Sequence, residues 1–288
     1  MSEMSSRENT PERPVAVPPL LTVEGMSVRF AGIKALTDVS FQVQPGELFA
    51  VIGPNGAGKT SLFNVLSRVY QPVAGQVTYD GRDLLQLKTY QVARVGIART
   101  FQNLGQFPNT TVLDYLLLGR HTRMRSGILL GGIYIGRTRR EEQKNRAYCL
   151  HLLELLGLER LALFPLRSLP YGVQKRADLA RALALEPKLL LLDEPVAGMS
   201  VEESEDIAAA ILDIKEQLGI TQILVEHDMA LVMGIADRLL VLDFGRVIAQ
   251  GLPVEIQANP DVIKAYLGEE FGSRVSDDVL IPVDESLS

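Results

Sequence analysis

This chain of 288 residues has few cysteines, no excess of basic residues and no long apolar run, and each of these absences excludes a class of protein. Cys149 is its only cysteine, which excludes an internal disulfide and fits a reducing compartment; we read it as a small buried hydrophobe on a helix. The net charge of -6 leaves no basic excess to neutralise nucleic-acid phosphates. No stretch approaches the ~20 apolar residues of a membrane span, and the N-terminal segment lacks the apolar run of an export signal. We therefore expect a cytosolic protein, or one attached to a membrane through a partner, with no nucleic-acid ligand.

What is present favours one large domain between two polar tails. Apolar residues make up 47% of the chain and charged residues 22%, enough to build a sizeable core. Residues 1–19 are rich in Ser, Glu, Arg and Pro, and we expect them to be disordered. Residues 269–288 are polar and acidic, and we expect a loose tail there. The domain then occupies residues 20–268.

Strand and helix signals alternate along this domain. Short apolar runs typical of strands covered on both faces occupy residues 48–52, 189–192 and 221–225. Further strand signals lie at 41–43 and 76–79, and a hairpin is expected over 238–250; helical spacing is found at 141–156, 173–185 and 202–218. This alternation predicts an α/β domain with a mainly parallel sheet. The stretch from about 84 to 168 is mostly helical in pattern, and we expect an inserted helical subdomain there that extends to 186.

Residues 53–60 read GPNGAGKT, which fits G-x-x-x-x-G-K-[ST] between a predicted strand and a predicted helix. Glycines let the backbone N–H groups turn inward around phosphate oxygens, and the helix N-terminus adds partial positive charge. Lys59 supplies a mobile charge for the terminal phosphates, and the Thr60 hydroxyl is a ligand for Mg²⁺. The alternative is a glycine-rich turn that matches by chance. The nucleotide-binding candidates are Gly53, Pro54, Asn55, Gly56, Ala57, Gly58, Lys59, Thr60 and Ser61.

Two adjacent carboxylates end the second apolar run, LLLLDEP at 189–195. The strand delivers Asp193 to the carboxyl edge of the sheet, where ligands bind in open α/β sheets. We expect Asp193 to hold the Mg²⁺ shell and Glu194 to polarise a water molecule. The alternative is a strand that ends in solvated acids.

Two further candidates follow the same logic. His227, in VEHD, emerges after the third apolar run at the same edge, and there it can reach a γ-phosphate; a lone His is more often a packing or surface residue. Gln102, in TFQN, begins the helical insertion, where a neutral amide can sense metal or water.

Together these motifs resemble an ATP-binding-cassette (ABC) transporter ATPase, from about residue 21 to 268. The ordered set is GPNGAGKTS, TFQN, SLPYGVQKRADLARAL, LLLLDEP, AGMS and VEHDM. More narrowly, the chain looks like the longer of two cytosolic ATPases in branched-chain amino acid uptake systems. That likeness rests on YQVARVGIARTFQN, EHDMALVMGIADRLLVLDFGRVIAQG, NPDVIKAYLGEE and an extra segment around 120–140.

The resemblance implies a P-loop NTPase fold with an N-terminal antiparallel β portion and a dimer that holds two ATPs with Mg²⁺ at its interface. It assigns Glu194 as general base and His227 as the γ-phosphate contact. Gln102 would be the metal- and water-linked switch, with Thr60 and Asp193 as the other metal-linked residues. Phe30 lies where the family often has an adenine-stacking aromatic; the alternative is a core phenylalanine.

The resemblance also implies partners and a location. It predicts integral-membrane permease subunits, a second ABC ATPase subunit, identical or related, and indirectly a periplasmic solute-binding protein. It places the chain at the cytoplasmic face of the inner membrane, powering uptake of a small polar solute such as branched-chain amino acids or related amides. The segment 126–136, SGILLGGIYIG, lies between arginines and is a surface loop, a permease contact or, through its basic flanks, a contact with an anionic membrane surface.

The signature loop departs from the family pattern of Leu-Ser-Gly-Gly-Gln. Leu169 and Gly172 agree, whereas Pro170 replaces the Ser and Val173 replaces the Gln. A lost charge-assisted bond to phosphate costs about 1.5–3 kcal/mol. Ser200 also stands where the family usually has Asp or Asn. Two hypotheses stay open: a weakened but working cap over ATP, in which Gly172 still contacts the nucleotide, or a degenerate site that needs a partner with a complete signature.

Two other functions also stay open. A soluble ABC-type ATPase acting on ribosomes or DNA commonly has two cassettes or coiled-coil inserts, whereas this chain has one phosphate loop and no heptad run. A small P-loop kinase would lack DEP followed by a switch His and would need a lid over its acceptor.

Overall fold

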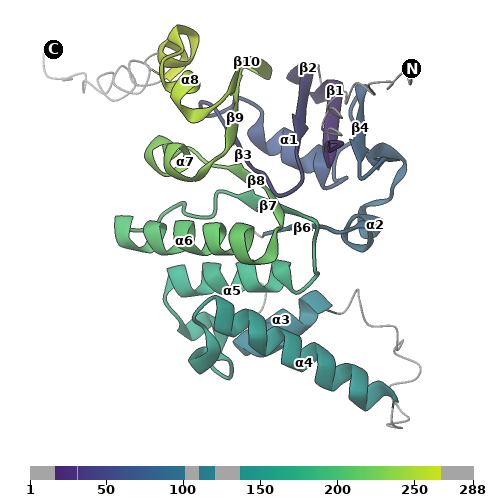
Figure 1. Cartoon of the computed structure of the whole chain (residues 1–288). Coiled ribbons are helices and arrows are strands. Elements are labelled where there is room, and N and C mark those ends of the chain that lie inside the picture. Colours follow the sequence, from purple (N-terminus) through teal and green to yellow (C-terminus); the bar gives the residue numbers. More distant parts are fainter. Residues whose placement is uncertain (1–16, 31, 101–109, 121–136, 267–288) are drawn as a thin grey trace, which may run out of the picture.

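The computed structural model describes residues 17–30, 32–100, 110–120 and 137–266. Within them lie a four-stranded and a six-stranded sheet, with a layer of helices beyond the larger sheet (Figure 1). The expected tails, 1–19 and 269–288, fall almost entirely outside the described residues, as does the segment 126–136.

The smaller sheet is antiparallel and has the strand order β2-β1-β4-β5. Inward residues of β1 such as Val23 and Val28 are buried, and their neighbours are more exposed, because one face packs on the core and the other meets solvent. This is the N-terminal antiparallel portion that the resemblance implied. Its strands are β1 (Leu21–Phe30), β2 (Ile33–Val43), β4 (Ala74–Tyr79) and β5 (Arg82–Asp83).

The larger sheet has the order β10-β9-β3-β8-β7-β6 and is parallel except for the β9–β10 hairpin. Every residue of β3, β7 and β8 is buried, as expected for apolar runs covered on both faces. These strands confirm the predicted α/β class. Their bounds are β3 (Leu48–Ile52), β6 (Ile97–Arg99), β7 (Leu189–Asp193), β8 (Thr221–Val225), β9 (Arg238–Asp243) and β10 (Arg246–Gly251).

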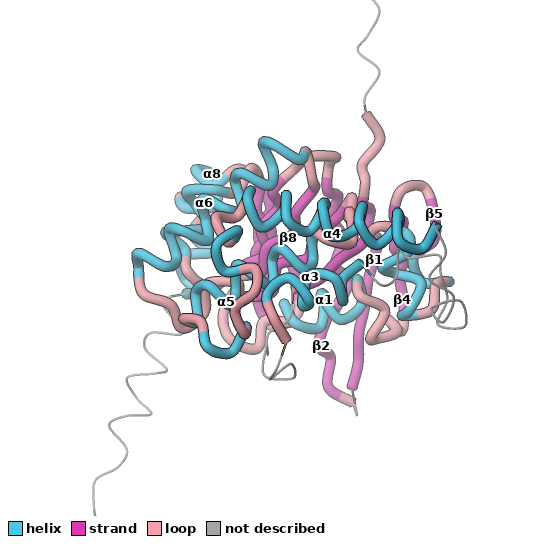
Figure 2. The backbone as a smooth tube through the Cα atoms, turned by 90° about the horizontal axis from the view of Figure 1, so that it is seen from below, coloured by secondary structure: helices cyan, strands magenta, loops and turns pink. Residues whose placement is uncertain are grey.

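Two hydrophobic cores lie on opposite faces of the larger sheet. Leu190 and Leu192 of β7 point into the core shared with the helical layer, whereas Leu189 and Leu191 point into the core shared with the antiparallel sheet and α1. Seen from the helical end, α3, α4 and α5 lie in front of the strands (Figure 2). The helices are α1 (Lys59–Leu66), α2 (Thr89–Val92), α3 (Val112–Arg120), α4 (Arg137–Leu155), α5 (Tyr171–Leu183), α6 (Val201–Leu218), α7 (Met229–Ile235) and α8 (Pro253–Gln257).

One strand lies in a stretch that the sequence pattern predicted to be mostly helical. β6 (Ile97–Arg99) falls inside the stretch 84–168 and forms the edge strand of the larger sheet beside β7. Three residues are too few to show a strand period. In the described part of this stretch, the short helix α2 precedes β6, and the longer helices α3 and α4 follow it from Val112 onward.

Cys149 is fully buried in α4, as predicted. Burial raises the pKa of its thiol to about 11, so the group stays protonated and unreactive near neutral pH. None of the helices in the described ranges combines the length and apolar character needed to cross a bilayer.

Candidate nucleotide-binding and hydrolysis site

The glycine-rich loop connects β3 to α1 as predicted, and it is closed by backbone contacts. The Ala57 N–H donates to the Pro54 carbonyl at 3.1 Å, and the Gly245 N–H donates to the Ala57 carbonyl at 3.0 Å. The β9–β10 turn therefore supports the loop from one side. The Thr60 side chain at the start of α1 is exposed, and that of Ser61 is half-buried.

Two positions of the loop require glycine. Gly53 has φ 149°, and a Cβ there would lie 2.0 Å from the Leu242 carbonyl oxygen. Gly58, the residue before α1, has φ 103°, and a Cβ would lie 2.7 Å from the Ala35 carbonyl oxygen. Both positive φ values and both close approaches exclude a side chain. The sequence motif thus has a direct structural cause.

Lys59 folds back over the loop that precedes it. Its Nζ donates to the carbonyl oxygens of Gly53 at 2.5 Å and Pro54 at 3.0 Å, and the residue is 7% exposed. The ammonium therefore lies over the loop cradle itself, where terminal phosphates are expected.

The carboxyl ends of β7 and β8 bring the predicted acidic residues and His227 to one edge of the sheet. Asp193 pairs in register with Val225, and the Glu194 N–H donates to the Val225 carbonyl at 2.9 Å. Glu194 has φ 46° and is half-buried, whereas Asp193 is 3% exposed. A positive φ in a residue that is neither Gly nor Asn is uncommon, and here it ends the extended backbone of β7.

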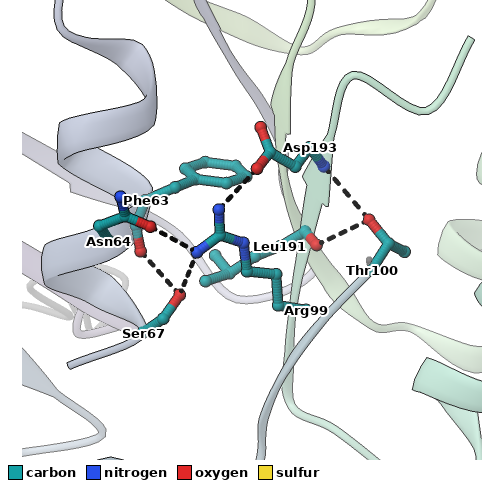
Figure 3. A network of polar contacts seen from close by, with 7 residues as sticks. All are labelled: Phe63, Asn64, Ser67, Arg99, Thr100, Leu191 and Asp193. Carbon is teal, nitrogen blue, oxygen red and sulfur yellow. Dashed lines mark hydrogen bonds and ion pairs between the residues drawn. The ribbon is translucent and has the colours of Figure 1, made fainter. Parts of the chain in front are cut away.

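An arginine that the sequence analysis did not single out holds Asp193 (Figure 3). The Nη2 of Arg99, the last residue of β6, lies 2.6 Å from Asp193 Oδ2. Its Nη1 donates to Asn64 Oδ1 at 2.9 Å and to Ser67 Oγ at 3.2 Å. The signal available in the sequence was a cation three positions before Gln102, which means little until β6 is placed beside β7.

A second missed residue, Glu226, is a fully buried carboxylate between two loops. It accepts hydrogen bonds from the Val196 N–H at 2.9 Å and the His227 N–H at 3.1 Å. Desolvation raises the pKa of Glu226, the two backbone N–H groups and His227 oppose that rise, and Glu194 adds to it. An acid directly after an apolar strand was the available signal.

His227 lies beside this carboxylate. Its Nδ1 is 3.6 Å from Glu226 Oε2, while the side chain is 59% exposed. The imidazole is thus held from one side and open to solvent on the other. The structure therefore brings Asp193, Glu194 and His227 to one edge, as the sequence predicted.

The signature loop forms the N-terminus of α5. Pro170 is the N-cap residue, with φ −53°, and the Gln174 N–H donates to its carbonyl at 3.0 Å. A proline side chain cannot accept a hydrogen bond from the first turn as a serine would, and no side chain caps this end of α5. Gly172 is buried, and a Cβ would lie 3.0 Å from Glu203 Oε1.

Ser200, which departs from the family pattern, has a structural role. It is the N-cap of α6 and forms a capping box with Glu203: the Glu203 N–H donates to Ser200 Oγ, and the Ser200 N–H donates to Glu203 Oε2. Since Glu203 also faces Gly172, the starts of α5 and α6 lie against each other.

Phe30 is not a core residue, which excludes the alternative that the sequence left open. It is 40% exposed at the end of β1, and its ring meets Tyr70 edge-on at a centroid distance of 4.6 Å. Adenine stacking on Phe30 stays a prediction. Gln102 lies outside the described residues.

This fold and loop define an ATP-binding-cassette ATPase. The family model described as "ABC transporter" matches residues 36–197, more than half of the 288 residues. A second model, described as "Branched-chain amino acid ATP-binding cassette transporter", matches residues 246–272. The chain belongs to the ABC transporter family, which confirms the resemblance seen in its motifs.

Curated relatives cover nearly the whole domain. The chain is 40% identical over 251 residues to "High-affinity branched-chain amino acid transport ATP-binding protein BraF" of Pseudomonas aeruginosa, covering 87% of this chain and 98% of that protein. It is 39% identical, with the same coverage, to the corresponding protein LivG of Escherichia coli.

Solved structures agree on the fold. A crystal structure of the ADP conformation of an ABC transporter cassette superposes with a TM-score of 0.77 at 30% identity, covering 88% of this chain and 100% of that one. A dimeric post-hydrolysis cassette bound to ADP and Pi superposes with a TM-score of 0.66 at 25% identity, covering 81% and 98%.

Proposed function

We propose that this chain is the ATP-binding and ATP-hydrolysing subunit of an importer for branched-chain amino acids or related amides. The observation that carries the proposal is the meeting of the phosphate loop, Asp193, Glu194 and His227 around the carboxyl edge of one sheet. The solute class is supported by the names of relatives that are about 40% identical to this chain, which are branched-chain amino acid transport proteins.

Each residue has a chemical task in this proposal. The loop N–H groups surround the phosphates, and Lys59 exchanges its carbonyl contacts at Gly53 and Pro54 for phosphate oxygens. Glu194 accepts a proton from the attacking water as it adds to the γ-phosphorus, while the bond from the γ-phosphorus to the β–γ bridging oxygen breaks and ADP leaves. His227 donates a hydrogen bond to a γ-phosphate oxygen and so orients the transferred group.

The residues present fit Mg²⁺. Thr60 offers a hydroxyl and Asp193 a carboxylate, both oxygen donors of the kind Mg²⁺ prefers. The described ranges hold no cluster of three or more His, Cys, Asp or Glu side chains, which suits an ion shared with nucleotide phosphates rather than caged by protein. When bound, Mg²⁺ supplies charge that neutralises phosphate oxygens.

The proposal includes a dimer in which the α5 N-terminus of one subunit caps the ATP of the other. The supporting observation is that this N-terminus keeps its helical N–H groups although Pro170 replaces the signature serine. The dimeric relative bound to ADP and Pi has the same fold. Further partners in the proposal are membrane permease subunits and, through them, a solute-binding protein, with the chain on the cytoplasmic face of the membrane.

Pro170 also favours a second candidate. In this alternative the chain is a degenerate partner in a heterodimer, and the companion carries the complete signature. The two candidates differ in whether the chain hydrolyses ATP alone.

The test is the steady-state ATPase of the purified chain beside that of Glu194→Gln. Removing the general base should lower kcat by about 10²–10⁴-fold and leave ATP binding intact. The exposed Glu216→Gln on α6 is the matched control and should keep the parent rate. Equal, negligible rates for parent and Glu194→Gln, rescued only by a companion ATPase, would favour the degenerate partner; no ATP binding under any condition would contradict the proposal.

A further inference from the structure

Arg99 lies at the meeting point of three elements. Its side chain reaches from the end of β6 to Asp193 on β7 and to Asn64 and Ser67, which belong to α1 and its C-cap (Figure 3). The centre of its guanidinium also lies 5.7 Å from the centroid of the Phe63 ring, within cation–π range. One side chain thus connects the phosphate-loop helix to the carboxylate expected to hold the Mg²⁺ shell.

These contacts fix the orientation of the Arg99 guanidinium before any nucleotide binds. The guanidinium is planar, so two acceptors on α1 and its C-cap and one acceptor on β7 define its plane and leave the side chain little rotational freedom. The Arg99 backbone is held as well, because Arg181 Nη2 donates to its carbonyl oxygen at 3.0 Å. Arg181 belongs to α5, the helix that begins with the signature loop. The position of Arg99 is therefore set by the surrounding fold, independently of any nucleotide.

The charge on Asp193 requires a cation. The residue is 3% exposed, and a buried carboxylate without a counter-charge is strongly unfavourable. Arg99 provides that charge at 2.6 Å. A divalent cation that arrives with nucleotide brings a second positive charge to the same carboxylate, so binding of the one weakens binding of the other.

We propose that Arg99 is a positioning residue that serves as the resident counter-cation of Asp193, and that Mg²⁺ must compete with it when nucleotide binds. The proposal rests on the proposed function, since it takes Asp193 as the Mg²⁺-linked residue. Arg99 yields part or all of its contact with Asp193 and keeps Asn64 and Ser67.

The experiment measures ATP affinity with and without the metal, by calorimetry on the full chain in a Glu194→Gln background. The readout is the ratio of the ATP Kd in EDTA to the ATP Kd in Mg²⁺. In Arg99→Gln the uncompensated Asp193 repels metal-free ATP and attracts Mg²⁺, so the ratio should rise by about fivefold or more. Without nucleotide or metal, the thermal unfolding midpoint of Arg99→Gln should fall.

Two control variants separate the effect of the Arg99 positive charge from other effects of the substitution. Arg94→Gln removes an exposed arginine from the same region and should leave the ratio unchanged. Arg99→Lys keeps the charge and should stay closer to the parent ratio than to that of Arg99→Gln. If Arg99→Gln does not fold, Asn64→Ala/Ser67→Ala replaces it: loosening the guanidinium should also raise the ratio.

The outcomes separate the two proposals. If the ratio of the ATP Kd in EDTA to the ATP Kd in Mg²⁺ is unchanged or lower in Arg99→Gln, the proposed competition between Arg99 and Mg²⁺ is wrong. The same holds for the Asn64→Ala/Ser67→Ala variant where it replaces Arg99→Gln. Matching ratios for Arg99→Lys and Arg99→Gln contradict it too, because the charge would then not matter. If the Glu194→Gln parent binds no ATP even with Mg²⁺, the proposed function fails instead.

Discussion

At the scale of single residues, Glu226 is the least expected feature of the site. The Glu226 side chain is fully buried. Its carboxyl group accepts hydrogen bonds from the N–H groups of both Val196 and His227. Val196 lies two residues after Glu194 in the same turn, so the turn that carries the proposed general base and the loop that carries the proposed γ-phosphate contact share this one acceptor. Glu226 therefore fixes their spacing.

Glu226→Gln should destabilise the fold by about 1–3 kcal/mol in acid, because both oxygens of the protonated carboxyl can still accept an N–H, whereas the NH₂ of the amide cannot accept at all. Desolvation raises the pKa of Glu226 above its usual 4.5 in the folded state. The folded parent therefore holds the proton more tightly than the unfolded chain, and its stability falls as pH rises from about 4.5 through the raised pKa. Glutamine does not titrate, so its deficit should shrink over that window.

Urea unfolding of Glu226→Gln and of the parent at several pH values measures this deficit. The exposed Glu216→Gln should stay within about 0.5 kcal/mol of the parent. If the difference in the free energy of unfolding between Glu226→Gln and the parent is absent, or does not change with pH, then Glu226 does not have the proposed raised pKa and structural role.

At the scale of elements, a buried polar cluster joins α3, α5 and β6. Asp178 is 1% exposed and accepts from Tyr115 Oη at 2.7 Å and from Arg181 Nε at 2.8 Å. Burial, together with Asp178, raises the pKa of the Tyr115 hydroxyl, which therefore remains a donor. Because Arg181 also holds the Arg99 carbonyl, the cluster links the signature helix to the strand that carries the Asp193 counter-cation.

Arg181→Met should lower the free energy of unfolding by about 3–5 kcal/mol, because it removes the arginine that pairs with the buried Asp178 carboxylate. Tyr115→Phe removes one hydrogen bond and should cost about 1–3 kcal/mol. Arg160→Met, at an exposed position, should change little. Denaturant unfolding measures all three, and an Arg181→Met cost below that of Tyr115→Phe would contradict the ranking.

Sequence reasoning succeeded where a residue's neighbours in the chain decide its structure. The apolar runs of β3, β7 and β8, the glycines at 53 and 58, and the helix that ends at Gly219 all depend on local periodicity or backbone sterics. Arg99 and Glu226 were missed because their partners lie on other strands and loops. A short edge strand such as β6 cannot be predicted from its own residues, because it is defined by its pairing with the neighbouring strand, Leu189–Asp193.

At the scale of the whole molecule, the parallel sheet lies between the antiparallel sheet and the helical layer (Figure 1). The phosphate loop leaves β3 toward one core, and the signature loop begins a helix that packs in the other. The proposed dimer brings the signature loop of one copy onto the phosphate loop of its partner. ATP would then be enclosed only when two copies meet, and the closing movement would be passed to membrane subunits.

Light scattering on the Glu194→Gln chain, with and without a related companion ATPase, measures this association most directly. Binding of Mg²⁺–ATP should convert the monomer to a particle of twice the mass. Replacing ATP by ADP should return the particle to the mass of the monomer. A chain that binds Mg²⁺–ATP tightly yet stays single, alone and beside the companion, would contradict the account.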